Sequence, residues 1–201
     1  MYRVHGDKII RRRTNYRKAN DIQRYTKILR EDFGNMCGYC GKDFNIINCP
    51  YQKDHLIPED IAKKVGRLDL LTDYNNLVYS CRVCNRNKWH NWPFDNVDKT
   101  HDDKVGFVDP ATEEFDEHMM RDENGRIVPR TQVGIYMYKI FNFSNRLTDV
   151  WWKLSVISKE INEIDSLLEK EENVDGLREY RRLHRQFNSF IKSLKDANES
   201  I

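Results

Sequence analysis

Two cysteine pairs constrain this chain more than any other feature of its sequence. CGYC occupies residues 37–40 and CRVC occupies residues 81–84. Each pair can hold a tetrahedral zinc ion from a tight turn, with sulfur atoms about 2.3 Å from the metal. The alternative, a redox dithiol, typically shows one such pair beside a βαβ pattern. We therefore predict a closed structural zinc site whose ligands are Cys37, Cys40, Cys81 and Cys84. A fifth cysteine, Cys49, is unpaired, and we interpret it as a packing residue.

The charge of the chain is distributed unevenly. Residues 1–30 contain ten Lys or Arg and two Asp, a net charge of +8, whereas the whole chain carries +2. The remaining residues therefore carry a net charge of −6. A basic arm on a slightly acidic body is a common footprint of polyanion binding. A solvated basic tail that aids solubility is an equally good reading of this feature alone.

Size and composition favour a soluble protein with one good core. The chain has 201 residues, of which 39% are hydrophobic and 33% are charged. It contains no apolar run near the roughly 20 residues that span a bilayer. Its first residues, MYRVHGDKIIRRR, lack the apolar stretch of a secretory signal. We therefore expect no membrane association and a cytoplasmic location.

Four segments can be distinguished along the chain. Residues 1–36 combine the basic arm with a helical pattern that Gly34 ends, and residues 37–92 hold every chemical motif. Residues 93–145 contain short strands, one predicted in VGFVDP and two in a hairpin that turns at Asn124-Gly125. We expect His101 and His118, in this third segment, to be ordinary surface or structural histidines.

Residues 146–201 give the clearest helical signal. Apolar residues recur with a 3-4 spacing that places them on one helix face, at Leu147, Val150, Leu154, Ile157, Ile161, Ile164 and Leu168. The pattern resumes after Gly176, at Tyr180, Leu183, Phe187, Phe190 and Leu194. This predicts an antiparallel helical hairpin whose two stripes pack together, with a partner or dimer surface as the alternative. Trp151 and Trp152 are adjacent, so one of them should pack elsewhere.

The stretches between and after the cysteine pairs carry further motifs: DHLIP at 54–58, NNL at 75–77 and CNRNK at 84–88. In this order they resemble the HNH endonucleases of the ββα-metal fold, in the branch that a four-cysteine zinc site staples. The resemblance covers about residues 31–92. It implies an α+β fold with a small ββα core, to which the basic arm and the helical hairpin are attached.

The resemblance also implies catalytic roles, for His55, Asp54, Asn76 and Asn85. His55 would activate water, since an imidazole with an ordinary pKa near 6.5 can accept a proton at physiological pH. Asp54 and Asn85 would supply oxygen ligands to a hydrated Mg²⁺ or Mn²⁺ ion. Asn76 would fix the loop that orients the base. Successive strand residues face opposite sides, so Asp54 and His55 can share a site only where the strand ends or bulges.

The expected substrate is DNA, with RNA as an alternative. Candidate phosphate contacts are basic side chains on or beside the start of the helix that begins near Cys84 and in the arm, namely Arg82, Arg86, Lys88, Arg11, Arg12 and Arg13. An ordinary basic helix face is the competing interpretation. His90 is an alternative ligand or base, although KWHNWP favours packing of Trp89 and Trp92 against the core.

A finer resemblance concerns the lead-in ILREDFGNMCGYC. It is similar to HNH proteins of bacterial anti-phage systems of the Septu and retron-associated kind. That likeness implies an ATPase partner, for which the C-terminal helices are the candidate surface. Two other functions remain open: a non-catalytic zinc module that binds nucleic acid, and a structural subunit whose helical hairpin drives assembly.

Overall fold

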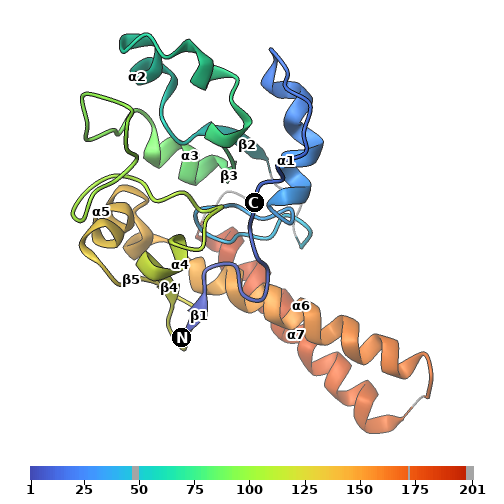
Figure 1. Cartoon of the computed structure of the whole chain (residues 1–201). Helices are drawn as coiled ribbons and strands as arrows, with labels where there is room; N and C mark the ends of the chain where they lie inside the picture. Colours follow the sequence, from blue (N-terminus) through green and yellow to red (C-terminus); the bar gives the residue numbers. More distant parts are fainter. Residues whose placement is uncertain (47–49, 172, 198–201) are drawn as a thin grey trace.

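The computed structural model describes residues 1–46, 50–171 and 173–197, so Cys49 lies outside the described residues. Helices and two small sheets make up the molecule, which confirms the α+β expectation (Figure 1). The lead-in helix is present as η1 (Ile22–Tyr25) and α1 (Thr26–Asp32). It ends where predicted, because Gly34 takes a positive φ of 56°.

The second segment is a two-stranded sheet followed by a helix. Strand β2 (Tyr51–His55) pairs antiparallel with β3 (Leu77–Cys81), and α3 (Arg82–Lys88) follows directly. The chain between the strands forms α2 (Glu59–Lys64), η2 (Leu68–Leu71) and η3 (Tyr74–Asn76). Every residue of β3 is buried, so this strand forms the centre of the main core.

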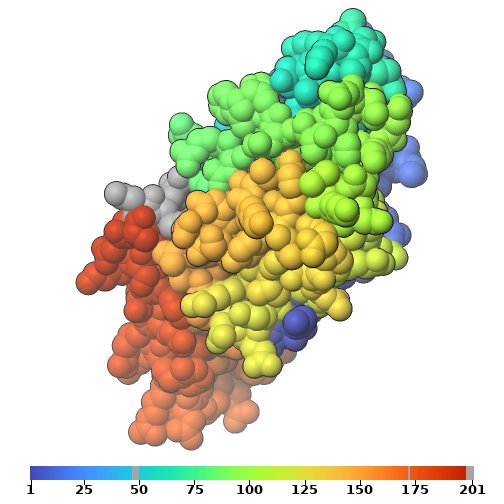
Figure 2. Space-filling view, turned by 90° about the vertical axis from the view of Figure 1, so that its left-hand side faces the viewer, coloured from blue at the N-terminus to red at the C-terminus, as the bar shows by residue number. Residues whose placement is uncertain are grey.

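The third segment contributes a second sheet. Strand β4 (Met119–Arg121) pairs with β5 (Ile127–Pro129), which confirms the predicted hairpin around Asn124-Gly125. β1 (Tyr2–Arg3) adds to the free edge of β4, a pairing that the sequence did not reveal. Helices α4 (Phe115–His118) and α5 (Gln132–Ile140) and the turn η4 (Phe143–Asn145) complete this part. In Figure 2 it fills the middle of the molecule, between α2 at the top and the C-terminal helices.

The prediction of a strand in VGFVDP is wrong. Phe107 and Val108 are buried, but the backbone forms only an isolated bridge between Gly106 and His101. Phe107 and Val108 pack into the core without a partner strand, and the backbone N–H of Val108 donates to the sulfur of Met137. Burial alone, which the sequence indicates, does not require strand pairing.

Arg121 joins the parts of the molecule. Its guanidinium is fully buried and donates to four backbone carbonyls, those of Val4, Cys40, Gly125 and Thr148. Burial lowers the pKa of Arg121 from 12.5 to about 10. One side chain thus links the N-terminal strand, the first cysteine turn, the β4–β5 turn and the start of α6.

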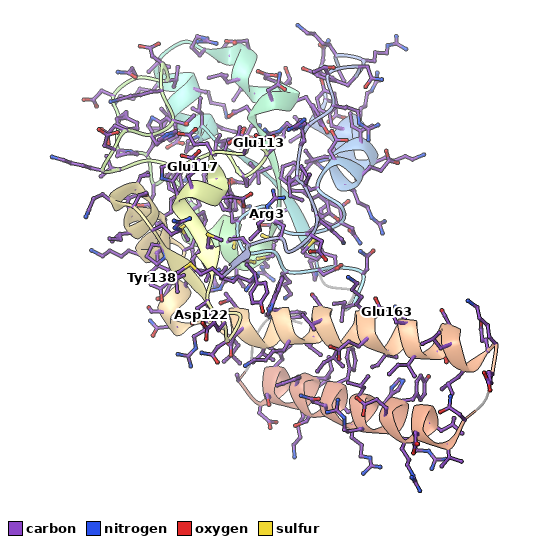
Figure 3. The ribbon with its side chains drawn as sticks, turned by 60° about the horizontal axis from the view of Figure 1, so that its bottom comes forward. Arg3, Glu113, Glu117, Asp122, Tyr138 and Glu163 are labelled. Carbon is purple, nitrogen blue, oxygen red and sulfur yellow. The ribbon has the colours of Figure 1, made fainter. Side chains whose placement is uncertain are left out.

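The C-terminal helices form the predicted antiparallel hairpin. α6 (Thr148–Leu168) and α7 (Val174–Asp196) lie side by side and extend away from the body (Figures 1 and 3). Their apolar stripes pack against each other through Ile157, Ile161 and Leu183. Trp151 belongs to the small core at the hairpin's base, whereas Trp152 lies against Gly6, Gly125 and Tyr2 on the body. Within the described ranges, no helix combines the length and apolarity that a membrane span requires.

Candidate active site and metal centre

The four cysteine side chains converge in the core. Their sulfur atoms all lie within 4.8 Å of one another, and the Sγ atoms of Cys40 and Cys81 are 3.9 Å apart. A tetrahedral zinc ion with bonds of about 2.3 Å needs sulfur atoms about 3.8 Å apart. All four thiols are buried and free of disulfides. The cluster therefore fits a structural zinc ion and leaves no ligand position open.

Side chains from other segments support this cluster. Arg146, just before α6, places Nη1 3.2 Å from the Sγ of Cys84 and Nη2 3.8 Å from the Sγ of Cys81. Burial alone would lower the pKa of Arg146, but the negative charge of the thiolates raises it above its ordinary value. A guanidinium at this distance offsets part of the net negative charge that four thiolates leave around a divalent ion.

His5 braces the first cysteine turn from the other side. Its Nε2 lies 2.7 Å from the carbonyl oxygen of Gly38, within CGYC, and the ring is buried. Burial lowers the pKa of His5 from 6.5 to about 4, so the ring is neutral and donates this hydrogen bond. Gly41 follows the turn with a φ of 66°, and a Cβ there would lie 2.3 Å from the carbonyl oxygen of Val4. Only glycine allows this close approach.

Asp54 faces α3 and is already partnered. The carboxylate accepts a 2.5 Å hydrogen bond from the hydroxyl of Tyr39 and lies 3.3 Å from the Nζ of Lys88. Lys88 has no exposed area, and its ammonium also donates to the carbonyl oxygen of His55 at 2.6 Å. Burial and the charge of Asp54 raise the pKa of Tyr39 well above its ordinary value, so this hydroxyl stays protonated and donates. A cation that binds Asp54 must therefore compete with Lys88.

Asn85 lies on the same side of β2. Its Nδ2 donates to the Oε1 of Gln52 at 2.6 Å, and Gln52 precedes Asp54 by two residues on the same strand face. That bond turns the amide so that its Oδ1 is available, since no hydrogen bond among the described residues uses it. Asp54 and Asn85 thus present a carboxylate and an amide oxygen from neighbouring positions, which are the donor types that Mg²⁺ and Mn²⁺ prefer.

His55 is the last residue of β2 and faces the opposite way. Its Nε2 lies 3.0 Å from the carbonyl oxygen of Leu71 in η2, and its Nδ1 lies 3.4 Å from the Oε1 of Glu59. A carbonyl can only accept, so Nε2 carries the proton and Nδ1 of the neutral ring is the basic nitrogen. The regular register of the β2–β3 pair continues through Asp54 and His55, without a bulge between them.

Asn76 holds the loop that His55 contacts. Its Oδ1 accepts from the backbone N–H of Ile57, and its Nδ2 donates to the carbonyl oxygens of Ile57 and Leu70. The side chain is buried and uses both ends of its amide. It therefore fixes the position of η2, which carries the carbonyl that orients His55.

This part of the chain matches a known protein family. The model of the HNH endonuclease family matches residues 37–91. These residues form an HNH endonuclease domain. The match begins at Cys37, the first cysteine of the cluster, and includes β2, β3 and α3. No curated protein and no solved structure matches the chain.

Some basic residues in and around the HNH domain are exposed, and the others are held by acidic side chains of the protein itself. Arg82 and Arg86 are exposed on α3, and Arg11 is exposed beside Glu113. The prediction that Lys88 contacts phosphate is wrong, because its ammonium is buried against Asp54. Arg12 is also buried and donates to Asp109 and to the carbonyl oxygen of Leu77, so it supports β3. Arg13 pairs with two acids of α1, Glu31 and Asp32.

Several neighbours of the HNH site were not found from the sequence. Tyr39 and Gln52 carry no motif of their own, although Gln52 shares a strand face with Asp54 by alternation. Trp92 packs partly against the main core, as expected, but Trp89 is 65% exposed, which contradicts the predicted packing. His90 forms an exposed pair with Asp60 and lies outside these contacts.

Proposed function

We propose that the protein is a divalent-metal-dependent endonuclease that hydrolyses phosphodiester bonds in DNA. The observation that carries this proposal is the state of His55. The carbonyl oxygen of Leu71 in η2 accepts from Nε2–H, so Nδ1 of the neutral ring carries the lone pair, and the half-exposed carboxylate of Glu59 lies 3.4 Å from it. A non-catalytic module has no need for a histidine fixed in this tautomer. The HNH match at residues 37–91 supports the same reaction class.

In this proposal Nδ1 of His55 takes a proton from the attacking water. The hydrogen bond to Leu71 keeps the ring in place while it becomes an imidazolium. Glu59 is about half exposed, so it can rotate to admit the water and then stabilise the positive ring by its charge. Asn76 acts as a positioning residue, because it holds the loop that carries the Leu71 carbonyl.

Asp54 and Asn85 would hold the Mg²⁺ or Mn²⁺ ion. When bound, such an ion neutralises charge on the phosphoryl oxygens and stabilises the leaving alkoxide. The two side chains face α3 whereas His55 faces η2, so the phosphate would lie across the end of β2. Lys88 holds the Asp54 carboxylate in place before the cation arrives.

The exposed basic residues near this site can bind the phosphate backbone of the substrate. Arg82 and Arg86 project from α3, next to Asn85, and Arg11 adds charge from the arm. We propose that they contact the phosphate backbone without reading sequence. In a bacterial cytoplasm such a nuclease would serve anti-phage defence together with an ATPase. The extended α6–α7 hairpin, which leaves Val156 and Leu167 exposed, supports a partner surface there.

The test is plasmid nicking with Mg²⁺, Mn²⁺ and EDTA. His55→Ala should reduce the nicking rate at least about a hundredfold, as expected for loss of a general base, while affinity for DNA is retained. The matched control is His90→Ala, an exposed histidine of the same domain, which should cleave like wild type. Equal cleavage by His55→Ala and wild type would contradict the assignment. Binding of DNA without nicking under any of these metals would favour the non-catalytic module.

A further inference from the structure

We propose a second metal site, formed by His101, Glu114 and His118, outside the HNH domain. Their ligand atoms all lie within 4.8 Å of one another. The Oε1 of Glu114 is 2.9 Å from the Nε2 of His101 and 3.6 Å from the Nε2 of His118. Ligands bound at about 2.05 Å in a tetrahedron lie roughly 3.3 Å apart, so both carboxylate–imidazole distances are close to the spacing of a zinc site.

The orientation of both rings supports a metal. The Nδ1 of His118 lies 2.7 Å from the Oγ1 of Thr131, and the Nδ1 of His101 lies 3.2 Å from the Oγ1 of Thr100. In metal sites, the second ring nitrogen is typically held by such an outer partner while the first binds the ion. The Oγ1 of Thr131 also accepts from the backbone N–H of Gly134, which holds the hydroxyl in place beside the ring.

The Nε2 of His118 has no hydrogen-bond partner although it is buried. Buried polar atoms are rarely left unsatisfied, and a bound metal ion would give this nitrogen its partner. Among the ion pairs of the described residues, Glu114 has only the two imidazoles as partners, whereas its neighbour Glu113 pairs with Arg11. The carboxylate is thus aimed at the two rings and is not neutralised by a cationic side chain.

The backbone holds the two histidines firmly. His101 forms a bridge with Gly106, where an added Cβ would lie 2.4 Å from the Cα of His101. His118 ends α4, and a Cβ at Gly134 would lie 2.3 Å from its carbonyl oxygen. Figure 3 labels Glu113 and Glu117, the residues that precede Glu114 and His118 in the chain. The two histidines therefore come from tightly packed backbone segments, and the half-exposed Glu114 joins them from the start of α4.

Two imidazoles and one carboxylate select a first-row divalent metal, and zinc fits best because it accepts this set in a four-coordinate site. Three protein ligands leave one position for water. The site differs in kind from the four-cysteine cluster, which is closed. The chain would then bind two zinc ions, one through sulfur and one through nitrogen and oxygen.

The test is zinc stoichiometry by mass spectrometry of the full chain after incubation with ZnCl₂ and gel filtration. Wild type should retain two zinc ions, and titration calorimetry on protein with one equivalent bound should show a second site tighter than about 10 µM. Glu114→Gln should retain one zinc, and its fold is not at risk because this side chain is 48% exposed. Glu113→Gln, the neighbouring control, should retain two.

His118→Gln supplies a second variant with the same expected loss. Its circular dichroism and its retained first zinc report whether it has folded. One zinc in wild type would overturn the proposal, since the three residues would then form only a histidine–carboxylate contact. Two zinc ions in Glu114→Gln together with two in His118→Gln would also overturn it, because the second ion would then be bound elsewhere.

Discussion

The buried pair between Lys88 and Asp54 gives a test that separates structure from catalysis. Its two charges lie 3.3 Å apart, which corresponds to about 5 kcal/mol of attraction at an effective dielectric constant near 20. Desolvation offsets much of this attraction, but removing one partner leaves the other charge buried alone. We therefore expect Lys88→Met to lower the free energy of unfolding by about 3–5 kcal/mol. Tm should fall by about 6–20 °C, given the size of the chain.

Asp54→Asn should cost a similar amount, because it leaves the Lys88 ammonium without its carboxylate. The double variant, Asp54→Asn with Lys88→Met, should recover at least about 2 kcal/mol relative to the sum of the single changes. Urea unfolding followed by tryptophan fluorescence, at constant zinc, measures all four proteins. Lys63→Met is the control, because Lys63 pairs with Glu59 at the surface and should contribute less than about 1 kcal/mol.

Nicking by the same proteins then assigns Asp54. If Asp54 holds the catalytic ion, the double variant regains stability and stays inactive. Wild-type cleavage by the double variant would refute the ligand role and leave Asp54 as a structural partner of Lys88. A loss of less than about 1 kcal/mol in Lys88→Met would refute the buried pair itself.

Three further predictions concern residues that contact the four-cysteine cluster or the turn that carries its first pair. Arg121→Met should lower the free energy of unfolding by at least about 3 kcal/mol, because it leaves four carbonyls without their donor; a loss below about 1 kcal/mol in urea unfolding would contradict this. The pKa of His5 is about 4 in the folded state and 6.5 when unfolded, so the unfolded chain binds the extra proton between these values. The contribution of His5 to the free energy of unfolding is therefore complete above pH 6.5 and is lost as the pH falls toward 4, by about 3 kcal/mol in total. His5→Gln should remove this part of the pH dependence of the free energy of unfolding. The same pH dependence in His5→Gln and wild type would contradict this. Arg146→Met should speed zinc release to a chelator about 10–100-fold, as other changes to outer partners of metal ligands do, and an unaltered release rate would rule out that role.

The sequence revealed the parts of the fold that depend on local spacing. The cysteine pairs predicted the convergence of four thiols, and the apolar spacing after Leu147 predicted α6 and α7. Turn chemistry at Asn124-Gly125 predicted the β4–β5 hairpin. In each case neighbouring residues determine the structure, so a pattern in the chain is sufficient.

Features that depend on distant contacts were missed. The motif CNRNK suggests that Lys88 is a surface cation. The fold buries it, because the carboxylate of Asp54, 34 residues earlier, pairs with its ammonium. Arg12 reads as part of a basic arm but is held by Asp109, 97 residues later. Glu114 and His118 are four residues apart at α4, but His101 has no motif spacing to either, and only the approach of a second turn brings it to them. Pairing across such separations leaves no periodic signal in the sequence.

The supports of the first cysteine turn come from outside the interval that matches the HNH family. Arg121 hydrogen-bonds the carbonyl of Cys40, and His5 hydrogen-bonds that of Gly38. Expressing residues 37–91 as an isolated domain would remove these two hydrogen bonds and expose the first cysteine turn to solvent. The smallest fragment that can be transplanted into another protein must therefore include both flanks, and engineering that grafts only the recognisable motif should yield an unstable product.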